Sequence, residues 1–290
     1  MICTLCPRSC GAERTADRPG GVCGQPSAPV VARAMLHQWE EPCLTGEHGA
    51  GTVFFSGCNL RCVYCQNKPV SQGGVGKAVS VSRLREIFRE LIARGAACLD
   101  LVTPTHFTPA ILEALGEEPW PVPVVWNCGG YEKPETLRLL EGKVQVYLPD
   151  LKYALPGPAG KYSAAPDYFD RAAPAIWEMF RQTGPYRVEN GLLTSGVLIR
   201  HLLLPGELEN TRRCLDWIAE TFRPGDVLVS LMSQYTPQPG ASGLLARRVT
   251  RAEYRAAVEY MENCGVTHGY TQERTSAQEA YTPDFDLSGI

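Results

Sequence analysis

Short apolar runs alternate with amphipathic segments from about residue 51 onward, and this alternation most constrains the fold. Six runs have the length and composition of buried strands: residues 51–57, 98–105, 123–128, 144–153, 196–206 and 226–235. Helical periodicity separates them, as in residues 80–95, where one face carries Leu84, Ile87, Phe88, Leu91 and Ile92. Repeated strand–helix units predict parallel strands joined by right-handed crossovers.

Several of these runs are apolar on both faces, so we expect the sheet to be covered on both sides. A closed barrel needs eight units; six leave an open doubly wound sheet or a partial barrel with a gap. In either topology the ligand site lies at the carboxyl ends of the strands. The residues least like a buried core gather at those ends: Cys58, Thr103–His106, Asn127–Gly130, Asp150, Lys152, Arg200, His201 and Ser233–Tyr235.

The composition argues against several classes of protein. A net charge of -3 provides no broad basic surface for nucleic acid. No apolar run reaches the roughly 20 residues that span a bilayer. The first residues, MICTLCPRSCG, lack the apolar core of a signal peptide. We therefore expect a cytoplasmic protein without nucleic-acid or membrane partners.

The 12 cysteines are the compositional anomaly, because most of them cluster near the start of the chain. In a reducing cytosol, clustered cysteines indicate metal ligands or catalytic thiols. Four others, scattered among apolar neighbours, are typical of small buried side chains: Cys98, Cys128, Cys214 and Cys264.

Three of the clustered cysteines, Cys58, Cys62 and Cys65, directly follow the first strand in FSGCNLRCVYCQN, residues 55–67. Thiolates so placed suit an iron–sulfur cluster or zinc. The loop has no fourth cysteine, so either a distant residue completes a structural site or the open position is where chemistry takes place. A cubane cluster held by three cysteines keeps one iron open for a small-molecule ligand.

The pattern C-x3-C-x-aromatic-C, formed by Cys58, Cys62, Tyr64 and Cys65, resembles the signature of the radical S-adenosylmethionine (SAM) superfamily. The resemblance extends over roughly residues 51–240. It implies a 4Fe–4S cluster whose open iron binds the amino and carboxylate groups of SAM. It also implies reductive cleavage of SAM to methionine and a 5'-deoxyadenosyl radical that abstracts hydrogen from a substrate. Tyr64 would then lie beside the adenine.

Within that superfamily the sequence is most similar to the pyruvate formate-lyase activating enzyme group. The similar elements are GCNLRCVYCQN, NCGG at 127–130, DLK at 150–152 and IRHLLLPG at 199–206. The SAM contacts that they imply come from Asn127, Asp150, Lys152 and Arg200. The second strand ends in VTPTHF, where the group has a Gly-Gly-Glu type element that receives the methionine amino group. Thr103, Thr105 and His106 would take its place.

Two pairs of polar residues interrupt apolar strands. Asp150 and Lys152 are two apart and face the same side of a strand, either as a buried ion pair or as contacts to SAM or a polar substrate. Arg200 and His201 are adjacent and face opposite sides. We expect Arg200 inside the barrel, at the SAM carboxylate or ribose, and His201 against the helices.

A second cysteine group, Cys3, Cys6, Cys10 and Cys23, has the spacing of one filled four-thiolate site, either zinc or a second iron–sulfur cluster. A filled site has no open position, which predicts structural support or electron relay. We assign residues 1–50 to a Cys-rich metal-binding segment and 51–270 to an α/β fold, a partial (β/α)6 TIM-type barrel. Residues 271–290 are expected to form an irregular tail.

The leading hypothesis is a radical SAM enzyme. The resemblance includes glycyl-radical activases, which abstract hydrogen from a backbone glycine of a partner protein; a different peptide or a small molecule is the alternative substrate. It also implies an electron donor such as flavodoxin or ferredoxin. Two hypotheses from other classes are a non-catalytic iron–sulfur electron carrier, which would not bind SAM, and a zinc-binding interaction protein that uses both cysteine groups.

Overall fold

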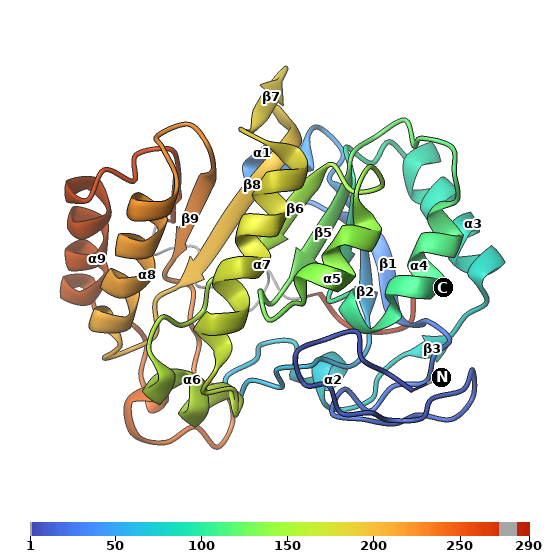
Figure 1. Ribbon diagram of the computed structural model, residues 1–290, viewed down its shortest axis with the longest axis horizontal. Coiled ribbons are helices and arrows are strands. Elements are labelled where there is room, and N and C mark those ends of the chain that lie inside the picture. The colour runs from blue at the N-terminus through green and yellow to red at the C-terminus, as the bar shows by residue number, and fades with distance from the viewer. Residues whose placement is uncertain (1, 273–282) are drawn as a thin grey trace.

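Six parallel strands form the middle of one sheet and follow each other in chain order (Figure 1). The computed structural model describes residues 2–272 and 283–290. The six strands are β2 (Ala50–Phe55), β4 (Leu99–Val102), β5 (Val124–Cys128), β6 (Val146–Pro149), β8 (Leu192–Leu202) and β9 (Leu228–Met232). All six were predicted. Because their order does not reverse, the topology is not that of a doubly wound sheet.

Shorter strands extend the sheet at both edges, so the sheet is mixed and open. β10 (Gly269–Thr271) pairs in parallel with β9. At the other edge, β1 (Val30–His37) runs antiparallel to β2 and to β3 (Lys77–Ala78). A hairpin strand, β7 (Arg187–Glu189), pairs with β8.

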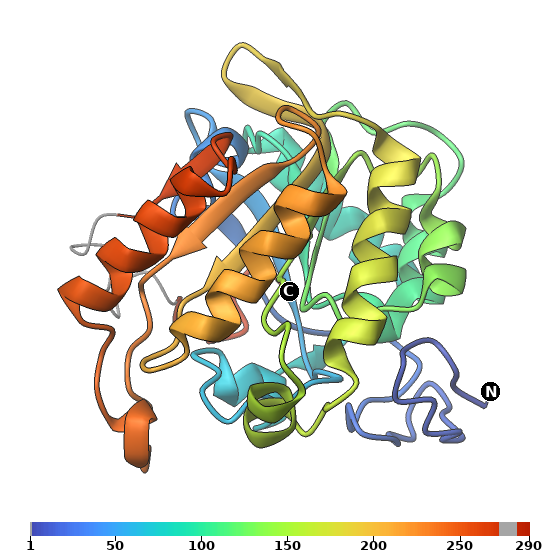
Figure 2. The same ribbon diagram turned by 60° about the vertical axis from the view of Figure 1, so that its left-hand side comes forward.

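The long helices lie together on one face of the sheet (Figures 1 and 2). They are α3 (Val81–Ala93), α4 (Thr108–Leu115), α7 (Tyr168–Thr183), α8 (Leu208–Thr221) and α9 (Arg251–Asn263). α3 shows why they form: Ser80 caps its first turn through the Arg83 amide, and the predicted apolar stripe is buried in the main core. The short elements are α1 (Pro42–Thr45), α2 (Lys68–Ser71), α5 (Pro134–Leu137), α6 (Pro156–Ser163), η1 (Thr105–Phe107), η2 (Arg138–Leu140) and η3 (Gly243–Ala246).

The other face of the sheet is apolar at one end and polar at the other. Near the amino ends of the strands, Val125, Val146 and Leu198 pack with Cys43 and Leu44 of α1, and α1 lies behind the strands in Figure 1. Toward the carboxyl ends the buried or half-buried side chains are polar: Thr52, Asp100, Asn127, Asp150, Arg200 and Ser230. The sheet is therefore covered on both faces, as expected, and its inner face carries a polar layer beneath the carboxyl ends.

The first 50 residues are less irregular than the sequence indicated. β1 is an eight-residue strand whose Met35 pairs with Thr52 of β2, and we did not predict it. Its stability comes from tertiary pairing with β2 rather than from a strong local pattern. Residues 2–29 contain no helix and only isolated bridges, such as Ile2 with Glu13.

Half of the predicted C-terminal tail, 271–290, lies outside the described residues, because 273–282 are not described. Residues 283–290 lie along β1. The Ala34 amide donates to the Ser288 carbonyl at 3.1 Å, and Phe285 packs edge-on against Phe54 with ring centroids 5.4 Å apart.

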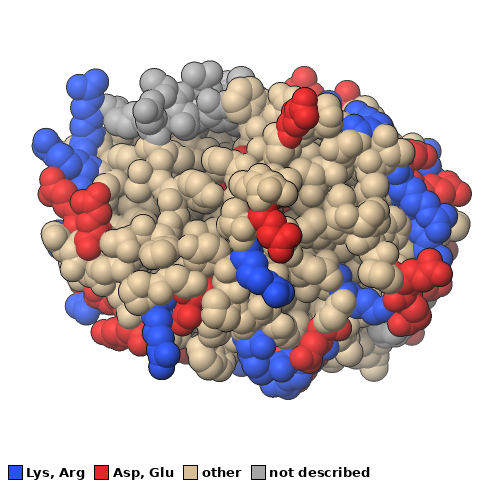
Figure 3. Space-filling model, turned by 90° about the horizontal axis from the view of Figure 1, so that it is seen from above, with Lys and Arg blue, Asp and Glu red and all other residues tan. Residues whose placement is uncertain are grey.

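The surface at the amino ends of the strands is seen from above in Figure 3. Lys and Arg are interspersed with Asp and Glu around its margin, and its middle is largely uncharged. In the described part of the chain, no helix is long and apolar enough to cross a membrane.

Candidate functional site

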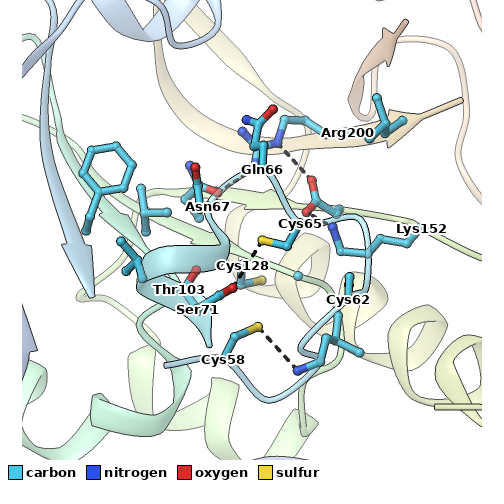
Figure 4. Close-up of a pocket in the computed structure, with 18 of the residues that line it drawn as sticks. Cys58, Cys62, Cys65, Gln66, Asn67, Ser71, Thr103, Cys128, Lys152 and Arg200 are labelled. Carbon is cyan, nitrogen blue, oxygen red and sulfur yellow. Dashed lines mark hydrogen bonds and ion pairs between the residues drawn. The ribbon is translucent and has the colours of Figure 1, made fainter. Parts of the chain in front are cut away.

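A cavity of about 240 Å3 opens at the carboxyl ends of the parallel strands, where both topologies considered above place a ligand site. Nine of the predicted cluster-ligand and cofactor-binding residues line it: Cys58, Cys62, Tyr64, Cys65, Thr103, Asn127, Asp150, Lys152 and Arg200. The cysteine loop closes one side of the cavity and the strand residues approach from the other (Figure 4).

The three cysteines belong to an irregular loop between β2 and α2. Gly57 starts it with a φ of +82°, and a Cβ there would lie 2.7 Å from the Cys23 carbonyl oxygen, so only glycine fits. Each sulfur accepts at least one hydrogen bond: Cys58 from the Leu60 amide at 3.4 Å, Cys62 from Ser163 Oγ at 2.9 Å, and Cys65 from Ser71 Oγ at 3.4 Å.

Two of the three thiols, Cys58 and Cys65, are held in conditions that disfavour a bare thiolate. Burial raises the pKa of the Cys58 thiol to about 12, and its neighbours Cys62 and Cys65 add to that rise. Burial and Cys62 likewise raise the pKa of Cys65. Thiolates in such a place require a cation. Hydrogen-bond donors stabilise the negative charge of a metal-bound thiolate. The three cysteines and the groups that donate to them therefore fit a soft metal centre.

Among the described residues, no three Cys, His, Asp or Glu side chains converge closely enough to hold a single metal ion. A four-iron cluster extends further than one ion, so its ligand sulfurs stand further apart. The three-cysteine loop is compatible with an iron–sulfur cluster.

A largely buried ion-pair network forms the strand side of the cavity. Arg200 Nε donates to Asp150 Oδ1 at 3.1 Å, Nη1 to Glu40 Oε1 at 3.1 Å, and Nη2 to Asn127 Oδ1 at 2.6 Å. Lys152 Nζ donates to the second oxygen of Asp150. The two cations lower the pKa of Asp150 against the opposing effect of burial. Three of the five N–H groups of Arg200 are used in this way, and the guanidinium is held rigidly at the cavity wall.

Arg200 and His201 face opposite sides, as expected from strand alternation. His201 is fully buried, with Nδ1 2.6 Å from the Leu151 carbonyl oxygen and Nε2 2.9 Å from Thr211 Oγ1. Both ring nitrogens have partners, and His201 does not line the cavity.

Glu40 is the site residue that the sequence analysis missed. It lies in the link between β1 and α1, a part of the chain that was assigned to the cysteine-rich segment. The sequence contains one signal, an acidic pair between Trp39 and Pro42. The second member, Glu41, is buried, which raises its pKa to about 7. Asp100 is also fully buried, accepts a hydrogen bond from Thr52 at 3.2 Å, and has its pKa raised by burial.

Thr105 and His106 lie away from the cavity, contrary to their expected contact with the cofactor. After Thr103, which has a φ of +59°, the chain turns into η1 and carries both side chains into the core. His106 Nε2 lies 2.7 Å from the Ser56 carbonyl oxygen, and burial lowers its pKa to about 4. Thr105 donates to Glu132 at 2.6 Å. Of the VTPTHF element, the geometry supports only Thr103 as a contact.

Glu132 supplies a pH-dependent prediction. Burial raises its pKa to about 8, above an unfolded value of about 4.3. The folded state therefore binds more protons between these values, and its stability falls as the pH rises from about 4 to 8. We expect the wild type to lose up to a few kcal/mol of unfolding free energy between pH 5 and pH 9. Glu132→Gln should lose less than the wild type, with the raised pKa values of Glu41 and Asp100 accounting for part of the loss that remains, as measured by urea denaturation at several pH values.

The matched control is Glu117→Gln, at a carboxylate that is 96% exposed, which should retain the wild-type pH profile. Equal pH slopes for Glu132→Gln and the wild type would show that Glu132 does not cause the loss.

The N-terminal cysteines pack directly against the three-cysteine loop. Arg8 lies between Cys6 and Cys10, and its Nε donates to the Asn59 carbonyl at 2.8 Å. In the other direction, Arg61 Nη1 of the loop donates a hydrogen bond to the Val22 carbonyl at 3.2 Å. Burial raises the pKa of the Cys6 thiol to about 11, and Cys3 and Cys23 add to that rise. The two cysteine groups are thus neighbours in space, and all 12 thiols are free.

Comparison with known proteins identifies a relative by sequence and a solved structure with a similar fold. No protein-family model matches the chain. The uncharacterized protein MJ0674 of Methanocaldococcus jannaschii is 29% identical over 279 residues, which cover 90% of this chain and 74% of that protein. The crystal structure of Streptococcus suis SuiB matches with a TM-score of 0.50 at 13% identity, covering 77% of this chain and 48% of SuiB.

A crystal structure of SuiB bound to S-adenosylmethionine gives a TM-score of 0.49 at 13% identity, covering 80% of this chain and 52% of SuiB. The chain thus spans about half the length of the solved protein that it matches. At this identity, the match to the first SuiB structure shows that the chain shares an α/β fold with it.

Proposed function

We propose that this chain is a radical SAM enzyme in which Cys58, Cys62 and Cys65 hold a 4Fe–4S cluster. The observation that supports it best is that the three thiols and a buried ion-pair network line the same cavity. When bound, the cluster supplies one electron to the SAM sulfonium, whose C5'–S bond breaks to give methionine and a 5'-deoxyadenosyl radical. That radical would abstract a hydrogen atom from the substrate.

The cavity side chains would bind and orient SAM. Arg200 has two N–H groups outside its protein contacts, enough for a bidentate contact with the SAM carboxylate. Asp150 and Lys152 would bind polar groups of the same molecule. Thr103 and Asn127 stand at the carboxyl ends of neighbouring strands, where the amino group of methionine or the ribose would lie. Tyr64, at the cavity wall, would contact the adenine ring.

The finer assignment is to a group like the pyruvate formate-lyase activating enzymes, on a partial (β/α)6 barrel. The sequence elements around Cys58, Asn127, Asp150 and Arg200 support it, and so does the unreversed order of six parallel strands. The substrate would then be a glycine of a partner protein; another peptide or a small molecule is the alternative. A flavodoxin or ferredoxin would supply the electron. An electron carrier that does not bind SAM has no use for a cavity beside the cluster.

Cys3, Cys6, Cys10 and Cys23 would hold zinc or a second iron–sulfur cluster. Their spacing and the proximity of Cys3, Cys6 and Cys23 support this assignment. A single tetrahedral ion would require the sulfurs to draw closer together than in this structure. Metal analysis of a variant that keeps only these four cysteines would distinguish zinc from iron.

The test is anaerobic reconstitution with iron and sulfide, followed by dithionite and SAM, with 5'-deoxyadenosine measured by chromatography. The wild type should form it, and a variant with Cys58, Cys62 and Cys65 replaced by alanine should not. A matched control replaces Cys98, Cys214 and Cys264, which lie away from the cavity, and should retain SAM cleavage. If the wild type binds iron but leaves SAM intact, the electron-carrier hypothesis is favoured instead.

A further inference from the structure

Ser163, the last residue of α6, lies against the middle cysteine of the loop. Its hydroxyl donates to Cys62 Sγ at 2.9 Å, whereas the hydrogen bonds to Cys58 and Cys65 are 3.4 Å long. Ser163 is 2% exposed and Cys62 is 6% exposed. A short bond in a place without solvent acts on the sulfur more strongly than an exposed one.

Two tyrosines extend this contact into a chain of hydroxyl groups. The Tyr153 hydroxyl lies 2.8 Å from Ser163 Oγ and 2.8 Å from the Tyr64 hydroxyl. A hydroxyl has only one proton to donate. Tyr153 donates its one proton to the Tyr64 hydroxyl, so it has none left for Ser163. The proton of Ser163 therefore faces two acceptors, the Cys62 sulfur and the Tyr153 oxygen.

The N-terminal cysteine segment holds the backbone of Ser163 in place. Arg8 Nη2 donates to the Ser163 carbonyl at 2.8 Å, and Nη1 donates to the carbonyl of Ala164, which has a left-handed backbone conformation. The third donor of the same guanidinium, Nε, reaches the Asn59 carbonyl beside Cys58. One side chain therefore fixes the cysteine loop and the end of α6 relative to each other.

We propose that Ser163 sets the reduction potential of the cluster held by Cys62, as a positioning residue whose hydroxyl donates to the Cys62 sulfur. This inference rests on the proposed function. Reduction adds an electron to the cluster and its thiolates, and a donor aimed at a sulfur stabilises that added negative charge. The Ser163 hydroxyl therefore raises the potential and makes the cluster easier to reduce.

A purely structural role for Ser163 makes a different prediction. If the hydroxyl only packs α6 against the loop, its loss would lower stability and cluster content together, and the remaining clusters would keep their potential. The midpoint potential per intact cluster separates the two roles, and it can be measured without SAM or substrate.

The experiment compares the reconstituted wild type with Ser163→Ala, Ser163→Thr, Tyr153→Phe and Ser195→Ala. Iron and sulfide are counted first, and the midpoint is then read by a dye-mediated spectroscopic titration without SAM. The midpoint potential of Ser163→Ala should be lower than that of the wild type by about 59 mV. For a one-electron step, this lowers the ratio of reduced to oxidised cluster about tenfold at a given potential. Ser163→Thr, which keeps the hydroxyl, should return toward the wild type. Ser195, a buried serine on β8, is the matched control and should change nothing.

Tyr153→Phe removes the oxygen that competes with Cys62 for the Ser163 proton, so it should shift the midpoint in the opposite direction, toward easier reduction, by a smaller amount. If Ser163→Ala does not bind iron, the midpoint potential of Tyr153→Phe tests the inference in its place. An unchanged midpoint in a fully loaded Ser163→Ala or Tyr153→Phe protein would overturn the inference while leaving the proposed function intact. Failure of the wild type to form a cluster through Cys58, Cys62 and Cys65 would overturn both.

Discussion

Arg200→Leu should lower the free energy of unfolding by about 3–5 kcal/mol, the usual cost of removing one partner from a buried ion pair. Arg200 contacts two carboxylates, Glu40 and Asp150, at 3.1 Å each, and its side chain is 16% exposed. Lys152 still pairs with Asp150 after the change. Among the described residues, the remaining hydrogen-bond partners of Glu40 would be neutral, Asn127 and the backbone of Glu41, and an uncompensated charge away from water is the main source of the loss.

Chemical denaturation of the cluster-free protein at pH 7 measures this effect. The matched control is Arg213→Leu, which removes an ion pair to Glu209 in which both side chains are more than half exposed; its cost should be below about 1 kcal/mol. Adding Glu40→Gln to Arg200→Leu should recover part of the loss, because the unpaired charge disappears. A double variant no more stable than Arg200→Leu would show that the lost packing of Arg200, rather than the unpaired Glu40, dominates.

Gly130→Ala should be comparably damaging and should disorder the cavity wall. Gly130 has a φ of +77°, and a Cβ there would lie 2.1 Å from the Asp150 carbonyl oxygen and 2.6 Å from the Tyr168 hydroxyl. That hydroxyl donates to the Asp150 carbonyl at 2.6 Å and accepts from the Lys152 amide at 3.0 Å. The backbone that carries both charged residues must therefore move, which we expect to cost about 3 kcal/mol or more.

Gly142→Ala is a close control, because Gly142 has the same φ of +77° with nothing within 4 Å of its Cβ position. It should cost only the left-handed backbone strain, about 1–2 kcal/mol. The difference between the two variants in urea denaturation isolates the steric clash at Asp150. Equal losses would mean that the Gly130 loop relaxes without disturbing the strand that carries Asp150 and Lys152.

Local sequence patterns predicted the elements whose stability is largely local. The apolar stripe of α3 and the six parallel strands were found because helix and strand periods of 3.6 and 2 repeat within one segment. The placement of Cys58, Asn127, Asp150 and Arg200 at one cavity followed from one rule about strand ends. β1 and Glu40 were missed because the burial of each depends on residues far along the chain. Thr105 and His106 were misplaced because a turn after Thr103 reverses the expected direction of their side chains.

The sequence by itself determined the α/β class, the six central parallel strands and the loop that gathers three cysteines, since each of these depends on residues close together in the chain. Only the tertiary structure decided how the site is completed. Arg200 meets Glu40 across 160 positions, Ser163 reaches Cys62 across 101, and Arg8 reaches Ser163 across 155. Such contacts depend on how whole helices, strands and loops pack against each other. The hydrophobic periodicity of one segment does not indicate which distant side chains this packing brings together.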